Sequence, residues 1–481
     1  MNNKVIVLGA GIAGLAVSIN LLEKGYDVTI IEKNKDVGGL CSGYFVDGYY
    51  IDACLHWLMG TNKKSQLYKE WKNIGALTKD TKIISLPTLG SFEYEGTTVT
   101  FYRSLAKTEK ELVKISPEDK KPIRKFINSV KDMGSIMGIV LKNKNLTRKE
   151  IIHMLPNSAH IIRSIRWSRE EYAARFKHPA IQFAIKNAQT GYNNIFFYLD
   201  LYGLFTTGNA DVPKGGAYYM VQRIKQRFLD LGGKLILNTE AIKLNVKDEK
   251  VVSLKTNNEV IKADYFISTI DPKYTLKELL GNKYRIKLFD KLENTISKRS
   301  ISSCFNVYVA VEGDISKIDV PTVLHTKPIK VGSREIDALL VRHYGFDPEY
   351  FVKDGKTVVS LFVDQNQDDF NYFKSLSSEG YKKEKERITN DLIKAFNERY
   401  PNKVKFLSAF GPLELCKQAN TGYGSIQSYS FTDKGMIYSF NGKMKDIKNL
   451  FFCGQWTRSI GGTPTALLTA VALSKQFKNL N

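Results

Sequence analysis

An α/β fold with a parallel sheet is predicted by three features near the start of the chain. Residues 4–8 (KVIVL) form a short, β-branched apolar run of the kind found in buried parallel strands. A glycine-rich turn follows, and residues 14–24 then carry apolar side chains at helical spacing up to Gly25. Residues 27–32 (DVTIIE) have the pattern of a second strand that ends in an acid. Together these segments predict a strand–helix–strand unit.

The turn between the first strand and the helix has the pattern G-x-G-x-x-G. Gly9 permits the tight turn, Gly11 lets the backbone approach a pyrophosphate, and Gly14 lets helix and strand pack closely. The helix N-terminus offers unpaired N–H groups and partial positive charge to phosphates. Glu32 ends the second strand where a carboxylate can accept hydrogen bonds from a ribose diol. A glycine-rich packing turn would not explain Glu32, so the segment predicts an adenine dinucleotide site. Its predicted contacts are Gly9, Gly11, Ile12, Ala13, Gly14, Glu32 and Lys33.

A second glycine pair, Gly38-Gly39, follows Glu32 and is succeeded by Leu40. This pair lets more backbone approach an extended dinucleotide, which favours FAD over NAD. Three later stretches also carry glycine pairs or small residues beside apolar runs. They are PKGG at 213–216, before a Gly232-Gly233 turn and a strand at 234–237; ADYFISTIDP at 263–272; and NLFFCGQW at 449–456 with GGTP at 461–464.

In this order, from residue 4 to about residue 475, the motifs resemble the phytoene desaturase and retinol saturase branch of the FAD-dependent amine oxidase superfamily. The resemblance implies a Rossmann-like FAD-binding domain of the glutathione-reductase type. It also implies an interleaved, mixed α+β substrate domain with a helical cap. Leu40 stands where the family often has arginine. The FAD contacts implied by motif position are Gly38, Gly39, Leu40, Ala241, Gly454, Gln455, Gly462, Thr463 and Pro464.

The predicted domains are discontinuous. Segments 1–75, 210–285 and 440–481 are expected to form the FAD-binding domain, and segments 76–209 and 286–439 the substrate-binding domain. Within the latter, amphipathic spacing predicts helices over 105–185 and 385–399, and apolar runs predict strands at 300–312 and 357–364. The last helix of the chain is expected at 465–477, with its N-terminus near the flavin.

Three residues are candidates for the chemistry. His56 follows the N-terminal segment that the resemblance places beside the flavin, and it could shuttle a proton. Its alternative is a structural role. Tyr423 and Trp456 could shape an apolar pocket over the flavin ring, with core packing as the alternative.

The resemblance implies an FAD-dependent oxidoreductase that desaturates, saturates or isomerises C=C or C–C bonds of a small lipophilic, isoprenoid- or polyene-like substrate. Two alternatives stay open: a flavin amine oxidase and a non-catalytic FAD-binding protein. No second G-x-G-x-x-G is present. The electron partner is therefore left open among quinone, oxygen and NAD(P)H.

Composition is that of a globular protein, with 43% hydrophobic and 25% charged residues among 481. The five scattered cysteines favour reduced thiols in a cytoplasmic protein, and neither they nor the histidines form a metal motif, so no metal is expected. A net charge of +22 is read either as a compositional bias or as attraction to anionic surfaces. Its densest run lies at 142–149, no nucleic-acid motif accompanies it, and no nucleic-acid partner is expected.

Apolar residues of the cap could form a face that dips into a membrane. They are Met133, Ile136, Met137, Ile139, Val140 and Leu141. The alternative is packing between cap helices. No transmembrane helix is expected, and peripheral contact at the inner face of the membrane is a possible location.

Overall fold

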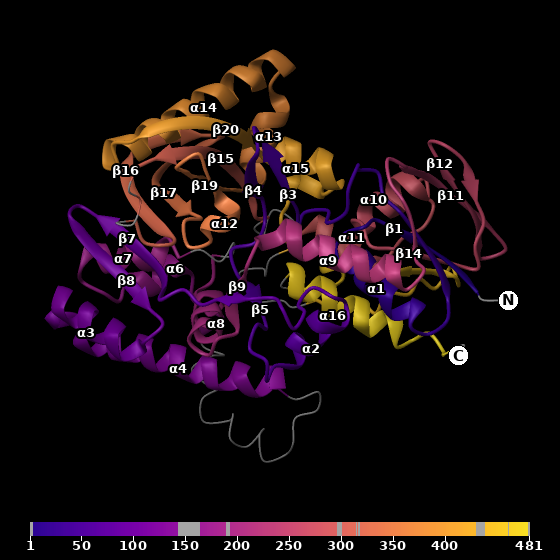
Figure 1. Cartoon of the computed structure of the whole chain (residues 1–481), viewed down its shortest axis with the longest axis horizontal. Coiled ribbons are helices and arrows are strands. Elements are labelled where there is room, and N and C mark those ends of the chain that lie inside the picture. The colour runs from indigo at the N-terminus through magenta and orange to yellow at the C-terminus, as the bar shows by residue number, and fades with distance from the viewer. Residues whose placement is uncertain are drawn as a thin grey trace.

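A five-stranded parallel sheet is assembled from three separated parts of the chain (Figure 1). The computed structural model describes residues 3–142, 164–188, 193–295, 301–313, 315, 318–429, 438–459 and 461–479. In spatial order the strands of this sheet are β10 (Lys234–Ile236), β2 (Asp27–Ile31), β1 (Lys4–Leu8), β14 (Tyr265–Ser268) and β21 (Leu450–Phe452). Every neighbouring pair is parallel. The predicted α/β class with a Rossmann-like domain is confirmed.

Two helices that lie far apart in sequence pack against each other beside this sheet. They are α1 (Ile12–Leu22) and α16 (Thr463–Ser474), and α9 (Gly216–Asp230) packs next to α1. Both α1 and α16 begin two residues before their predicted starts, because Gly11 and Gly462 act as their N-caps. Gly25, with φ of +88°, lies in the turn after α1.

An eight-stranded mixed sheet lies in the other half of the molecule, to the left in Figure 1. Its spatial order is β20 (Lys403–Phe410), β15 (Ser303–Glu312), β19 (Lys356–Gln365), β17 (Arg334–His343), β16 (Thr322–Val331), β7 (Thr88–Tyr94) and β8 (Thr97–Tyr102), with β18 (Val352–Lys353) pairing to β19. The sheet is mixed because β16 pairs with β7 in parallel while the other pairs are antiparallel. The strands predicted at 300–312 and 357–364 are β15 and β19.

Helix α14 (Ser378–Arg399) covers this sheet and begins seven residues before the predicted start at 385. Ser377 explains the earlier start, since its side chain accepts a hydrogen bond from the N–H of Gly380. Smaller helices around this sheet are α12 (Pro348–Phe351), α13 (Gln367–Ser375) and α15 (Pro412–Ala419).

Cap helices lie against the β7–β8 end of the sheet. They are α3 (Leu105–Ile115), α4 (Lys120–Lys142), α6 (Arg169–Ala173), α7 (Pro179–Lys186) and α8 (Ile195–Thr206). Helices α4 and α8 cross so closely that a Cβ on Gly203 would lie 2.6 Å from the backbone nitrogen of Gly134. Only paired glycines permit this approach.

The packing of α4 against α8 determines how far the proposed membrane-dipping face is buried. Met133 is buried, and Ile136, Met137 and Leu141 pack against the same cap core. Val140 is the exposed member at 39%. Met133 therefore lies inside the cap, while the other five residues of this face, Ile139 included, keep part of their surface exposed. The basic run at 142–149 lies largely outside the described residues.

The remaining elements lie around these two sheets, and β11 (Ala241–Lys247), β12 (Lys250–Thr256) and β13 (Val260–Ile261) form a separate three-stranded sheet. The hairpin of β3 (Gly43–Val46) and β4 (Tyr49–Asp52) packs Tyr50 and Ile51 against the eight-stranded sheet. The other elements are β5 (Leu58–Met59), β6 (Ile83–Ile84), β9 (Ala210–Pro213), α2 (Gln66–Asn73), α10 (Pro272–Tyr274) and α11 (Lys287–Asn294). No helix among the described residues is long and apolar enough to cross a membrane.

Candidate flavin site

One cavity begins at the glycine-rich turn after β1 and continues between α8 and the eight-stranded sheet. The volume of this cavity is about 380 Å³. Its walls come from the carboxyl ends of β1, β2 and β14, from the N-termini of α1 and α16, and from α8, β15, β19 and α15. Ligands of open α/β sheets bind at this edge, beyond the carboxyl ends of the strands.

The three glycines of the first turn have different structural roles. A Cβ on Gly14 would lie 1.9 Å from the carbonyl oxygen of Gly9, so Gly14 lets the helix pack on the turn. Gly9 itself has φ of +97°. A Cβ on Gly11 would meet only the carbonyl oxygen of Gly38, at 3.8 Å. Protein packing therefore gives no reason for glycine at position 11, and the space that it leaves open belongs to the cavity.

No side chain caps either helix that points its N-terminus at the cavity. Gly11 and Gly462 are the N-cap residues of α1 and α16, and neither first turn contains an acid. Their exposed N–H groups and helix dipoles favour an anion such as a pyrophosphate or a reduced flavin ring. Ile12, Ala13, Thr463 and Pro464 line the cavity at these two ends.

Glu32 is fixed at the adenosine end by hydrogen bonds from the backbone. Its carboxylate accepts from the N–H of Ala10 at 2.8 Å, and from the N–H and side-chain amide of Asn34 at 2.9 and 2.7 Å. The side chain is 5% exposed. Lys33 lies beside it and donates to Asn420 Oδ1 at 2.6 Å, and burial lowers its pKa.

The second glycine pair joins the first turn directly. Gly38 donates its N–H to the carbonyl oxygen of Ala10 at 2.9 Å and has φ of +115°. Gly39 and Leu40 line the cavity next to it. Gly454 (φ +121°) and Gln455 approach from the last motif, and Gln455 accepts a hydrogen bond from the N–H of Gly462 at 2.9 Å. Ala241 also lines the cavity.

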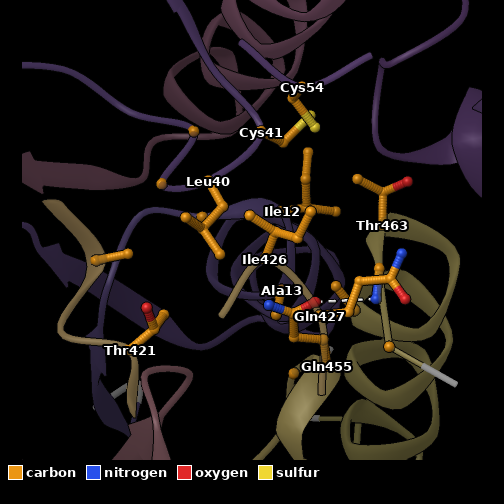
Figure 2. Close-up of a pocket in the computed structure, with 18 of the residues that line it drawn as sticks. Ile12, Ala13, Leu40, Cys41, Cys54, Thr421, Ile426, Gln427, Gln455 and Thr463 are labelled. Carbon is orange, nitrogen blue, oxygen red and sulfur yellow. Dashed lines mark hydrogen bonds between the residues drawn. The ribbon is translucent and has the colours of Figure 1, made fainter. Parts of the chain in front are cut away.

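Of the predicted cofactor contacts, Gly14 lies behind the turn and does not line the cavity; all the others do. Figure 2 shows Ile12, Ala13, Leu40, Gln455 and Thr463 around the same opening. Two buried polar atoms on its wall, Thr421 Oγ1 and Gln427 Oε1, have no hydrogen-bond partner among the described residues. The residues fit an extended, anionic dinucleotide.

The three candidates for chemistry are placed differently. His56 and Trp456 line the cavity, and Trp456 also packs edge-to-face on Tyr429 with ring centroids 5.6 Å apart. Tyr423 does not line the cavity. Its ring packs on Phe370 and its hydroxyl donates to Glu293 at 3.5 Å. Its place on the chain close to the last motif did not indicate this direction of the side chain.

His56 contacts a buried cation. Arg342 on β17 is 3% exposed and its Nη1 hydrogen-bonds to the His56 ring. Burial, together with the Arg342 charge, holds the pKa of His56 well below its usual range. The ring is therefore neutral at physiological pH. Because a guanidinium only donates, the unprotonated nitrogen accepts the hydrogen bond from Arg342 and the other nitrogen carries the N–H.

Asp200 is a cavity residue that the sequence did not single out. It lies on α8 between Phe197 and Leu201, which line the same wall. Its Oδ1 is buried without a hydrogen-bond partner among the described residues, and burial raises its pKa to about 7. As the single charged residue of an otherwise apolar helix, it carried a signal that sequence reasoning could have used. Among the described residues, no group of three or more His, Cys, Asp or Glu could hold a metal.

Fold and site together define an FAD-binding oxidoreductase. Residues 12–475 match the family of flavin containing amine oxidoreductases, and the chain belongs to this family. The predicted family, the FAD cofactor and the class of enzyme are thereby confirmed.

Among curated relatives, the chain is 21% identical to 1-hydroxycarotenoid 3,4-desaturase of Flavobacterium sp., with 99% of each chain covered. It is 22% identical to 4,4'-diapophytoene desaturase (4,4'-diaponeurosporene-forming) of Staphylococcus aureus strain COL, again with 99% of each covered. A solved variant of putrescine oxidase shares the fold, with a TM-score of 0.62 at 12% identity over 99% of this chain and 98% of that one.

Proposed function

We propose that the chain desaturates, saturates or isomerises carbon–carbon bonds of an elongated, lipophilic substrate of the isoprenoid or polyene type. The observation that carries the proposal is the continuity of the cavity. Beyond the dinucleotide end its wall becomes apolar and aromatic, through Trp57, Met59, Phe197, Leu201, Phe362 and Phe410. Two relatives that align with nearly the whole chain are named as desaturases of carotenoid-type substrates.

FAD, when bound, supplies hydride chemistry at its ring nitrogen N5, while the protein supplies orientation and electrostatics. The uncapped N-terminus of α16 would stabilise negative charge on a reduced flavin held beside it. The apolar wall from α8 and β19 orients a hydrocarbon chain and excludes water. His56 lines the cavity and is the candidate proton-shuttling side chain, and it can accept a proton once its ring releases the hydrogen bond from Arg342.

The domain division completes the proposal. Segments 1–75, 210–285 and 440–481 supply all strands of the parallel sheet, which supports their assignment to FAD binding. Segments 76–209 and 286–439 supply the eight-stranded sheet and α8, which supports their assignment to the substrate. Quinone, oxygen and NAD(P)H are the candidate electron partners.

The test is an anaerobic mixing experiment with the purified yellow holoenzyme. Polyenes such as linear carotenoid precursors should bleach the oxidised flavin and give products lighter by two hydrogens. Dithionite-reduced enzyme should add two hydrogens or isomerise at constant mass. If neither oxidised nor reduced enzyme changes any polyene offered, and bleaching occurs only with amines, the proposal is wrong.

Asp200 favours a second candidate, a flavin amine oxidase. Its unpartnered carboxyl faces the cavity and could pair with a substrate ammonium group. This candidate predicts hydrogen peroxide release with amines in air, and loss of that activity in Asp200→Asn. Peroxide release that is absent with a panel of mono- and diamines excludes it.

The positive charge of the chain supports peripheral contact with an anionic membrane surface, where a lipophilic substrate would be collected. Sedimentation with vesicles of phosphatidylglycerol and phosphatidylcholine checks this. Association should appear at low salt and fall as salt is raised. Absence of association at low salt would refute the contact.

A further inference from the structure

Two cysteines face each other across the base of the β3–β4 hairpin, and Cys41 follows the second glycine pair, donating its N–H to the carbonyl oxygen of Gly38 at 3.0 Å. Cys41 precedes β3 and Cys54 follows β4. The hairpin pairs Gly43 with Asp52. The ladder continues one step further, because the N–H of Ala53 donates to the carbonyl oxygen of Ser42 at 3.1 Å. In this register the next opposed pair is Cys41 and Cys54.

The register gives this pair the spacing that a disulfide needs. Hydrogen-bonded and non-hydrogen-bonded pairs alternate along an antiparallel ladder, so Cys41 and Cys54 occupy a non-hydrogen-bonded position. The Cα atoms of such pairs lie about 4.5 Å apart. Disulfides span Cα separations of about 4.4–6.8 Å. An S–S bond could therefore form with little backbone movement.

The two thiols already touch. Their side chains hydrogen-bond to each other, and Figure 2 shows the sulfur atoms side by side. Both residues line the flavin cavity, in which Ile12 and Thr463 mark the uncapped ends of α1 and α16. The hydrogen bond from Cys54 and burial raise the pKa of Cys41 well above its usual range. Cys41 is therefore held as a thiol, and both sulfurs lie on the wall of the cavity, from which an oxidant can reach them.

We propose that Cys41 and Cys54 are a reversible dithiol–disulfide couple that exchanges two electrons with the bound FAD. On oxidation two S–H bonds break and one S–S bond forms. The two electrons pass to oxidised FAD, and the two protons go to the reduced cofactor and to solvent. The reverse reaction returns both electrons to the disulfide. The chain thus stores a second pair of electrons beside the flavin, independently of which substrate the enzyme takes.

The experiment counts electrons in the holoenzyme. Protein oxidised with diamide, then desalted, is titrated anaerobically with dithionite while the flavin spectrum is followed. The wild-type holoenzyme should consume two electrons for FAD and two more for the disulfide. Cys54→Ser should consume only the two that reduce FAD. Cys416→Ser is the matched control, since that half-buried thiol does not line the cavity, and it should behave as wild type.

A second measurement does not depend on the variants. Non-reducing peptide mapping of the diamide-treated wild type should find the peptides of Cys41 and Cys54 joined, and mapping after flavin reduction should find them separate. Two electrons taken up by the wild type, or both thiols free after diamide, would overturn the proposal. A cross-link that persists when FAD is fully reduced would overturn it as well, since the disulfide would then be structural only.

Discussion

The two ends of the flavin cavity are built in different ways. At the dinucleotide end the walls are mostly backbone, namely glycines, exposed N–H groups and one fixed carboxylate. At the far end the walls are side chains from α8, β15 and β19, such as Asp200, Asn306 and Phe362. Backbone geometry follows from short local motifs, whereas side-chain walls depend on how distant segments meet. The first end should therefore be sensitive to single added atoms, and the second to changes of charge.

The largest effect is expected within the first turn, where two glycines separate folding from binding. Gly14→Ala places a Cβ 1.9 Å from the carbonyl oxygen of Gly9, so the folded state should lose more than about 3 kcal/mol. Gly11→Ala meets nothing closer than 3.8 Å and should fold normally but lose bound FAD. Urea unfolding of the FAD-free proteins and the flavin content after purification measure the two effects.

Equal loss of stability in both glycine variants would contradict this division of duties. Gly96→Ala is the control for backbone strain alone, because this glycine has φ of +79° and no heavy atom within 4 Å of its Cβ position. It should lower stability slightly and leave the flavin content unchanged.

The next effect concerns His56 at the junction of the two ends. His56→Ala should keep FAD bound and lower turnover of a working substrate by about 10²–10⁴-fold, because a positioned proton acceptor is removed. His325→Ala is the control, since that ring packs against Tyr94 and Phe183 and does not line the cavity. Turnover of His56→Ala at the wild-type rate would leave His56 with a structural role only.

The last contrast concerns how stability depends on pH, and it compares two aspartates near the cap. Burial raises the pKa of Asp200 to about 7, above its unfolded value, so the stability that its protonated form contributes is present below about pH 4 and lost as pH rises to about 7. As pH rises across this window, the free energy of unfolding of Asp200→Asn should therefore increase relative to that of the wild type, by at most about 4 kcal/mol at pH 8. Urea unfolding at several pH values checks the slope.

Asp211 is the contrasting case because it is paired. Its carboxylate lies 2.6 Å from the guanidinium of Arg103 and is 6% exposed. Asp211→Asn should lower stability by about 1–3 kcal/mol, because it leaves a partly buried cation without its partner.

A pH-independent difference between Asp200→Asn and the wild type would show that the Asp200 carboxyl is solvated in the folded protein.

The same contrast explains what could be predicted from the sequence. Gly9, Glu32 and the strand between residues 4 and 8 lie in one continuous segment, where spacing alone specifies geometry. Tyr423 was predicted to shape the pocket over the flavin, but its side chain points to Glu293 instead. The position of a residue in a motif does not give the direction of its side chain. Arg342 could not be linked to His56, since their contact joins β17 to the loop between β4 and β5, which are far apart in sequence.

The close crossing of α4 and α8 has a consequence for which molecules the enzyme admits. Gly203 lies one helical turn after Asp200 on α8, so the depth of the pocket wall is set by how near α8 approaches α4 at Gly134. One methyl group at that crossing would push the wall toward the flavin and shorten the room for a hydrocarbon tail. Chain-length preference could then diverge among descendants of this protein through a position that no ligand ever contacts.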